Sequence, residues 1–362
     1  YFGRILRGTG PDGFYSTHKL GAIGADLGAV ACFFTEPWQR LAPGLSVGDQ
    51  AWLLSVAAFS LRALGRLAEG LEPMRAGAEM RVEQADWKNA ASSYGNLAEL
   101  QLSLGRIALA VADAERSVDY ADHSGDAAWR MAFRTTLADA RHQQGKQEAA
   151  RRGFAEAEAM QAERQPQHPL LYSQGGFRYG ELLLAEAEQA AWGGPATAEG
   201  SEACAQVAQR AAQTLHGPKS IKRPSFLSLA LDHLTLARCA LYADLLHGRP
   251  PGEDAQQHTE AAVAGLRQAG TMDHLPRGLL TRAWLRHCLN DLPGAQADLA
   301  EAQRIAERGG MKLHLADIAL TRARLFEDKA ELAKARALIE ECGYGRRLPE
   351  LEDAEQRLRL TQ

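Results

Sequence analysis

The chain of 362 residues has few aromatic side chains and no large excess of charge of either sign. Aromatic residues make up 7% of the sequence, against 46% for hydrophobic residues as a whole. A core built from Ala and Leu rather than from large rings favours helices that pack closely. The formal net charge is −4, from 41 Lys and Arg against 45 Asp and Glu. Because nucleic-acid binding depends on a strongly basic face, we expect no nucleic-acid partner.

Cysteines are also few, and long apolar runs are missing. The five cysteines lie far apart without a CxxC pair; they are Cys32, Cys204, Cys239, Cys288 and Cys342. We expect reduced, mostly buried thiols in a cytoplasmic protein, rather than a zinc site or a disulfide framework. The apolar stretch over residues 20–34 is too short to span a bilayer and contains Asp26. It predicts a buried helix, and we expect no membrane partner.

Common catalytic and cofactor motifs are few as well. The sequence contains no HExxH or GxxxxGK[ST] pattern, and its 11 histidines are scattered, so a metal site would have to be assembled from distant segments. Gly8, Gly10 and Gly13 match the GxGxxG spacing. Pro11 and Asp12 interrupt that run and no Val/Ile-rich strand precedes it, so it indicates a turn. The sequence therefore predicts no enzyme activity, no cofactor and no metal ion.

A period of 40 residues is the strongest pattern that the sequence does contain. Gly105 and Gly145 each have an alanine seven residues before them and another five residues after them. Forty residues earlier, Gly65 has small or apolar residues at the same offsets. Small residues allow two antiparallel helices to approach closely, and a left-handed glycine between them ends the first helix. A fixed period of this length predicts a solenoid.

This framework resembles the tetratricopeptide repeat (TPR), a helix–turn–helix unit of about 34 residues. The longer period implies lengthened helices or loops. The resemblance implies an all-α fold, a right-handed α-α superhelix of about seven helical hairpins. In the sixth hairpin Asn290 takes the place of the turn glycine, because Asn tolerates the left-handed conformation.

The pattern divides the chain into five parts. They are an N-terminal helical lead-in over 1–49, hairpins one to three over 50–163, an irregular hairpin with loop insertions over 164–225, hairpins five to seven over 226–347, and a polar C-terminal capping helix over 348–362. The two insertions, Trp192–Ser201 and His216–Ser225, indicate surface loops or, alternatively, a hinge or a binding loop. Ser46 or Asp49 is expected to cap the first helix of the array.

A further resemblance lies in the phrases FRTTLADARHQQGK, LDHLTLARCAL, HLPRGLLTRAWLR, IAERGGMKLHLAD and IEECGYGRR. They are similar to the C-terminal TPR arrays of bacterial STAND signal-transduction NTPases, in which a nucleotide-binding switch precedes a repeat sensor. The likeness covers nearly the whole chain, but no residues match the nucleotide site of that class. It implies a sensor of a protein or peptide. Because the chain begins at Tyr1 rather than at a methionine, we expect it to be a segment of a longer protein. The resemblance implies that an NTPase domain precedes it. The alternatives are a small-molecule inducer sensor and a passive assembly scaffold.

In TPR proteins the residue after the small position of each first helix points into the concave groove. Carried over by register, this predicts a ligand-binding set of Glu99, Asp139, Glu181, Arg238, Arg277, Trp284 and Arg324, with Phe59 and Asp317 in the same register. The set predicts an acidic first half of the groove and an Arg/aromatic second half, which a partner with both a basic and an acidic end would fit. Alternatively, these are solvated side chains that share no ligand. Trp87, Trp129 and Trp192 are expected to pack between repeats.

Overall fold

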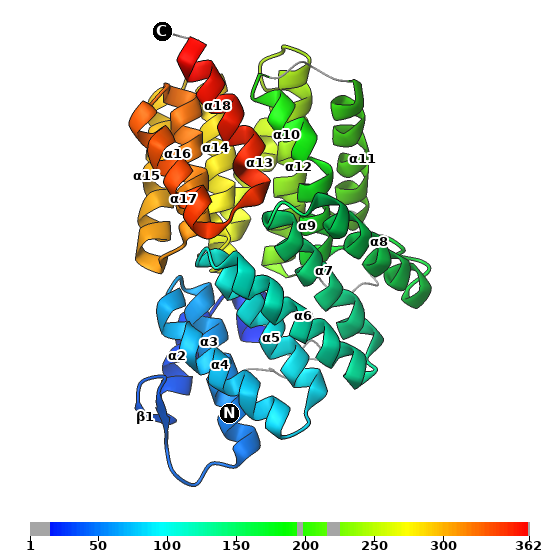
Figure 1. Cartoon of the computed structure of the whole chain (residues 1–362), viewed down its shortest axis with the longest axis vertical. Coiled ribbons are helices and arrows are strands. Elements are labelled where there is room, and N and C mark those ends of the chain that lie inside the picture. Colours follow the sequence, from blue (N-terminus) through cyan, green and yellow to red (C-terminus); the bar gives the residue numbers. More distant parts are fainter. Residues whose placement is uncertain (1–14, 194–197, 216–224, 361–362) are drawn as a thin grey trace.

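The computed structural model describes residues 15–193, 198–215 and 225–360, in which successive helices pack against one another (Figure 1). This described part contains eighteen α-helices and one two-stranded β-hairpin. The predicted all-α solenoid is therefore confirmed. None of the described helices is both long enough and apolar enough to cross a membrane. The described part holds no disulfide: three cysteines are buried, Cys288 is half-buried and Cys32 is exposed.

The N-terminal lead-in differs from the single helix expected over residues 20–34. Two short helices, α1 (Tyr15–Leu20) and α2 (Ile23–Ala31), are separated at Gly21, whose φ of 61° breaks the helix. The strands β1 (Phe34–Glu36) and β2 (Arg40–Leu41) follow as an antiparallel pair. The Ser46 side chain caps the next helix by accepting the Asp49 N–H, as predicted. The turn predicted at Gly8, Gly10 and Gly13 lies outside the described residues.

Three regular hairpins follow the lead-in. They are α3 (Val47–Ala63) with α4 (Leu67–Glu83), α5 (Trp87–Ser103) with α6 (Ile107–Ser124), and α7 (Ala127–Gln143) with α8 (Gln147–Arg164). The turn glycines Gly65, Gly105 and Gly145 have φ values of 76°, 77° and 83°. These left-handed values confirm the predicted role of the periodic glycines in ending each first helix.

The fourth hairpin is irregular because its second helix is split. Helix α9 (Ser173–Leu183) is followed by the short α10 (Ala185–Ala191), and α11 (Ala198–Leu215) then packs on α12. The loop predicted over residues 192–201 is wrong from residue 198 onward, because α11 begins there. Residues 194–197 and most of the second predicted insertion, 216–224, lie outside the described part.

The second half of the chain contains three more hairpins and a terminal helix. The hairpins are α12 (Phe226–Leu246) with α13 (Glu253–Ala269), α14 (Leu275–Cys288) with α15 (Leu292–Gly309), and α16 (Lys312–Phe326) with α17 (Lys329–Cys342). Asn290, with a φ of 64°, occupies the left-handed turn position as predicted. The 3-10 turn η2 (Gly345–Arg347) leads into α18 (Leu348–Leu360), which buries Leu351 and Leu358 in the core of hairpin seven.

The solenoid curves until its two halves touch. The N–H of Met272, just before α14, donates to the carbonyl of Ala63 at 2.7 Å. Helix α5 contacts α16, and α7 contacts η2. Figure 1 shows α14 to α17 on one side of the molecule and α7 to α12 on the other, with α2 to α6 across one end. A superhelical array in which each repeat contacts only its neighbours is expected to be elongated, with an extended groove. That expectation is wrong for this chain, because loops of the second half pack on turns of the first.

Replacing Gly145 with alanine tests this ring closure. A left-handed φ costs an alanine roughly 1–2 kcal/mol. A Cβ at Gly145 would also lie 2.9 Å from the carbonyl carbon of Gly345, and such overpacking adds about 1–3 kcal/mol. We expect Gly145→Ala to lower the free energy of unfolding more than Gly125→Ala does, as measured by urea titration.

Gly125 is the matched control for this comparison. Its φ is 65°, and a Cβ there would meet no described heavy atom within 4 Å. Equal losses of stability in the two variants would contradict the closed ring.

Candidate binding site

The predicted groove residues lie in the interior of the ring, each on the first helix of its hairpin. Two neighbouring cavities are lined by them: Glu181, Arg238, Arg277, Trp284 and Arg324 line one, and Glu99, Asp139 and Arg277 line the other. The structure therefore brings all seven side chains to one interior region. It also pairs most of them with one another or with residues that the sequence reasoning missed.

Glu99 is held between two arginines in what we call the N-terminal cluster. Arg62 Nη1 lies 2.6 Å from Glu99 Oε2, and Arg178 pairs with the other carboxylate oxygen. The same arginines reach further carboxylates: Arg62 Nε lies 3.2 Å from Asp273 Oδ2, and Arg178 Nε lies 3.6 Å from Asp139 Oδ2. Burial would raise the pKa of Glu99, but Arg178 and Arg62 outweigh it and hold that pKa at about 2. Glu99 therefore stays ionised at neutral pH.

A buried histidine beside this cluster adds no charge to it. His274 Nε2 lies 3.9 Å from Asp273 Oδ2. Burial lowers the pKa of His274 to about 4, although Asp273 acts in the opposite direction. The N-terminal cluster thus contains three carboxylates, Glu99, Asp139 and Asp273, against the two guanidiniums of Arg62 and Arg178.

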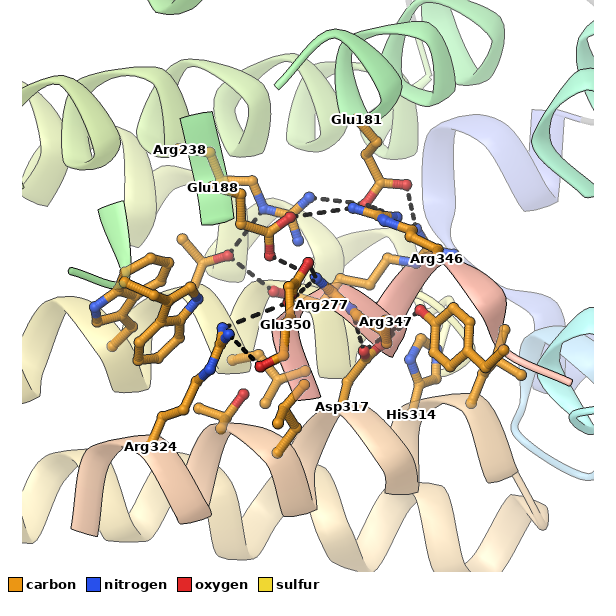
Figure 2. A pocket seen from close by; sticks show the side chains of 18 of the residues that line it. Glu181, Glu188, Arg238, Arg277, His314, Asp317, Arg324, Arg346, Arg347 and Glu350 are labelled. Atoms are coloured by element: carbon orange, nitrogen blue, oxygen red, sulfur yellow. Dashed lines mark hydrogen bonds and ion pairs between the residues drawn. The ribbon is translucent and has the colours of Figure 1, made fainter. Parts of the chain in front are cut away.

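Glu181 is the centre of a second, C-terminal cluster, drawn in Figure 2. Its carboxylate oxygens lie 2.8 Å from Arg238 Nη1 and 2.6 Å from Arg277 Nη1, and its side chain is 5% exposed. Burial would raise the pKa of Glu181, but Arg277, Arg346 and Arg238 hold it well below its usual range. A fully ionised carboxylate is thus enclosed by guanidiniums.

The turn η2 supplies two further arginines to this cluster. Arg346 Nη2 and Arg347 Nη1 lie 3.1 and 3.0 Å from the two oxygens of Glu188, and Arg347 Nε lies 2.8 Å from Asp317 Oδ1. Glu350, from the first turn of α18, lies 2.5 Å from Arg347 and 3.4 Å from Arg324. The pKa of Glu188, which burial would raise, is held at about 2 by Arg347 and Arg346.

Two stacked tryptophans line the same cavity as the C-terminal cluster. The rings of Trp192 and Trp284 lie 3.7 Å apart between centroids and within 10° of parallel, and the Arg324 guanidinium lies 4.9 Å from the Trp192 ring. Trp192 therefore packs across hairpins, as predicted. Trp129 also packs between hairpins, because it stacks on Phe133 of its own helix in a core cluster with Ala91 and Ala121 of hairpin two. Trp87 instead stacks on Tyr120 within its own hairpin.

The two clusters nearly cancel in charge and leave little free space. The C-terminal cluster has five guanidiniums, of Arg238, Arg277, Arg324, Arg346 and Arg347, against the four carboxylates of Glu181, Glu188, Asp317 and Glu350. The predicted contrast between the halves thus amounts to one more carboxylate than guanidinium in the N-terminal cluster and one more guanidinium than carboxylate in the C-terminal cluster. The adjoining cavities measure about 60 and 40 Å³, room for only a few water molecules. A peptide does not fit between these side chains as they stand.

Helical spacing could have found some of the paired arginines. Arg62 and Arg178 lie three residues from Phe59 and Glu181, so they share a helix face with predicted groove positions. Arg346 and Arg347 lie in the 3-10 turn η2 outside the hairpins, and the repeat register does not give the direction of their side chains.

An open concavity of about 390 Å³ adjoins the N-terminal cluster and is lined in part by its Arg62, Glu99 and Arg178. We call it the groove mouth and define it by Phe59, Glu99, Trp129, Phe133, Tyr172 and Arg178. Phe59, Trp129 and Tyr172 are half-buried, so part of each ring faces solvent. Side-chain amides of Asn96 and Gln174 add hydrogen-bonding groups to the walls. The groove mouth combines aromatic surface with the paired charges of Glu99 and Arg178.

No group of three or more His, Cys, Asp or Glu side chains within the described ranges is arranged to hold a metal ion. The chain matches no protein-family model, and a search of curated proteins finds no match.

Proposed function

We propose that this chain is the TPR-type recognition module of a larger, STAND-type signalling protein, and that it binds a protein-derived peptide at the groove mouth. The observation that carries the proposal is the 390 Å³ concavity, which lies within the size range of ligand sites. Its aromatic and arginine side chains are the types that anchor protein interfaces. Binding there would relieve inhibition of the upstream NTPase domain.

The chemistry of the groove mouth favours an apolar anchor with polar flanks. Phe59 and Trp129 offer ring surface to one large side chain of the peptide. The Gln174 amide can donate to or accept from the peptide backbone. Since Glu99 and Arg178 are already paired with each other, they can orient a polar group without leaving a bare charge.

Photo-crosslinking from the groove mouth tests this function. A photoreactive phenylalanine analogue at position 59 is expected to capture a partner, whose attached peptide mass spectrometry identifies. The same analogue in place of the exposed Leu289 is the control, because Leu289 lies in the turn of hairpin six, away from the groove mouth. Identical crosslinks from both positions would contradict the proposal.

Truncating the aromatic anchors should then weaken binding of the captured peptide. We expect Phe59→Ala and Trp129→Ala each to raise the Kd by about 10- to 30-fold, measured by isothermal titration calorimetry. Charge reversal at Arg238 or Arg277 is an unsuitable test, because both pair with the buried Glu181. An unchanged Kd in both aromatic variants would place the peptide elsewhere.

The same volume also supports a second candidate, a small-molecule inducer. A concavity of 390 Å³ can enclose a ligand of that kind without a peptide backbone. A thermal-shift screen of metabolites, repeated on Trp129→Ala, separates the two. A stabilising metabolite whose effect is lost in that variant would favour the inducer over the peptide.

A further inference from the structure

Residues 344–350 of the chain itself occupy what we call the inner groove, the part of the ring interior lined by Glu181, Glu188, Asp317 and Arg324. Figure 2 shows Arg346 and Arg347 directed from their turn towards Glu181, Glu188 and Asp317, and the side chains of the two arginines are only 5% and 12% exposed. Tyr344, at the start of the segment, is buried with its hydroxyl 3.3 Å from Asp317 Oδ2. The backbone of Gly345 touches the Gly145 turn from the opposite half of the ring. We call residues 344–350 the inner segment.

The charges of the inner segment match those that the groove presents. Its two arginines supply the ion pairs described for Glu188 and Asp317, and its Glu350 supplies the carboxylate described for Arg324. A chain with a basic end and an acidic end is what the residues of an open groove would accept. In this structure the inner segment of the same polypeptide takes that place.

The anchoring of the inner segment does not depend on its arginines alone. Beyond it, Leu351, Ala354 and Leu358 of α18 lie in the apolar core of hairpin seven. Tyr344 of the inner segment lies in the same core, whereas Arg346, Arg347 and Glu350 contact the groove through ion pairs and hydrogen bonds. A buried ion pair gains little net free energy over its solvated parts. Two arginines of a partner peptide, spaced like Arg346 and Arg347, can therefore replace those two side chains in the ion pairs.

We propose that the inner segment is an intramolecular pseudo-ligand, and that the inner groove accepts partner peptides that present two adjacent arginines to Glu181, Glu188 and Asp317. Displacing the segment would remove the contact between hairpin seven and hairpins three and four, whereas the contacts of Met272 with Ala63 and of α5 with α16 would remain. This site differs from the groove mouth and rests on its own ion pairs. A separate peptide can bind only while the tethered segment is undocked. Its apparent affinity is therefore the intrinsic affinity multiplied by the undocked fraction of the chain.

The test uses a fluorescein-labelled heptapeptide with the sequence of residues 344–350, YGRRLPE, added to the full chain and followed by fluorescence anisotropy. We expect the double variant Arg346→Ala/Arg347→Ala to bind it at least tenfold more tightly than the unaltered chain. Adding Glu188→Gln to that double variant should remove the gain. The peptide YGAALPE, which lacks both guanidiniums, should bind to neither chain.

The proposal is overturned if the folded double variant binds YGRRLPE no better than the unaltered chain does, or no better than it binds YGAALPE. Circular dichroism verifies folding. If the double variant does not fold, Arg346→Lys/Arg347→Lys decides, because lysine keeps the charge but loses the two-pronged pairing. A gain of at least threefold is expected there, and no gain overturns the proposal. Phe59→Ala should leave this binding unchanged, so failure here leaves the groove-mouth function standing.

Discussion

Replacing Glu181 with glutamine is expected to lower the free energy of unfolding by about 3–5 kcal/mol. The glutamine keeps the shape of the side chain but removes the charge that lies 2.8 and 2.6 Å from Arg238 and Arg277. Two guanidiniums would then stay buried without their shared carboxylate. Water cannot take the place of that carboxylate, because the Glu181 side chain is only 5% exposed. Urea titration followed by far-UV circular dichroism measures the loss.

An exposed ion pair provides the control for this prediction. Glu36 lies 3.1 Å from Arg40, but the two side chains are 56% and 73% exposed. Glu36→Gln should therefore cost less than about 1 kcal/mol. Similar losses for Glu36→Gln and Glu181→Gln would contradict the enclosed cluster.

Removing the charges of Glu181, Arg238 and Arg277 together should lower the free energy of unfolding less than removing the Glu181 charge alone. We expect replacement of Glu181, Arg238 and Arg277 together by methionine to recover much of the loss, because no unmatched charge of that trio remains. This comparison separates the cost of a buried unpaired charge from the cost of lost packing.

Replacing Asp232 with asparagine is expected to stabilise the chain by up to about 4 kcal/mol at pH 8, and to have little effect near pH 4. Asp232 is buried on α12, where burial raises the pKa of its carboxyl to about 7 although the Thr214 hydroxyl acts in the opposite direction. The folded chain thus keeps this carboxyl protonated up to about pH 7, whereas the unfolded chain ionises it near pH 4.

The sign of the pH dependence follows from these two values. As the pH rises from about 4 to about 7, the unfolded state gains the free energy of ionisation and the folded state does not, so the wild-type chain loses stability. Above about pH 7 the loss is complete. Asparagine has no such ionisation, so its advantage should appear within this window.

Thermal or urea unfolding of both chains across pH 4 to 8 checks the prediction. Asp119→Asn is the control, because Asp119 is exposed on α6 and its replacement should change stability by no more than about 0.5 kcal/mol at either pH. A difference between Asp232→Asn and wild type that does not vary with pH would contradict the raised pKa of Asp232.

The sequence by itself determined the parts of this protein that depend on one hairpin. Gly105 and Gly145 end their first helices, Asn290 does the same without a glycine, and Ser46 caps α3. Each of these follows from backbone preferences within a few residues. The direction of Glu99 and Glu181 into the interior could be inferred for the same reason, because a helix fixes the face on which a residue lies.

Only the tertiary structure decided which charges meet and whether the groove is open. Arg346 pairs with Glu188 across 158 positions of sequence, and Arg178 pairs with Glu99 across 79. Such pairs depend on the small rotation between successive hairpins, which adds up along the array until the two halves touch. A slightly different rotation would leave the same hairpins in an open superhelix. No local pattern encodes that sum, so the sequence indicated groove residues but not that the chain fills its own inner groove.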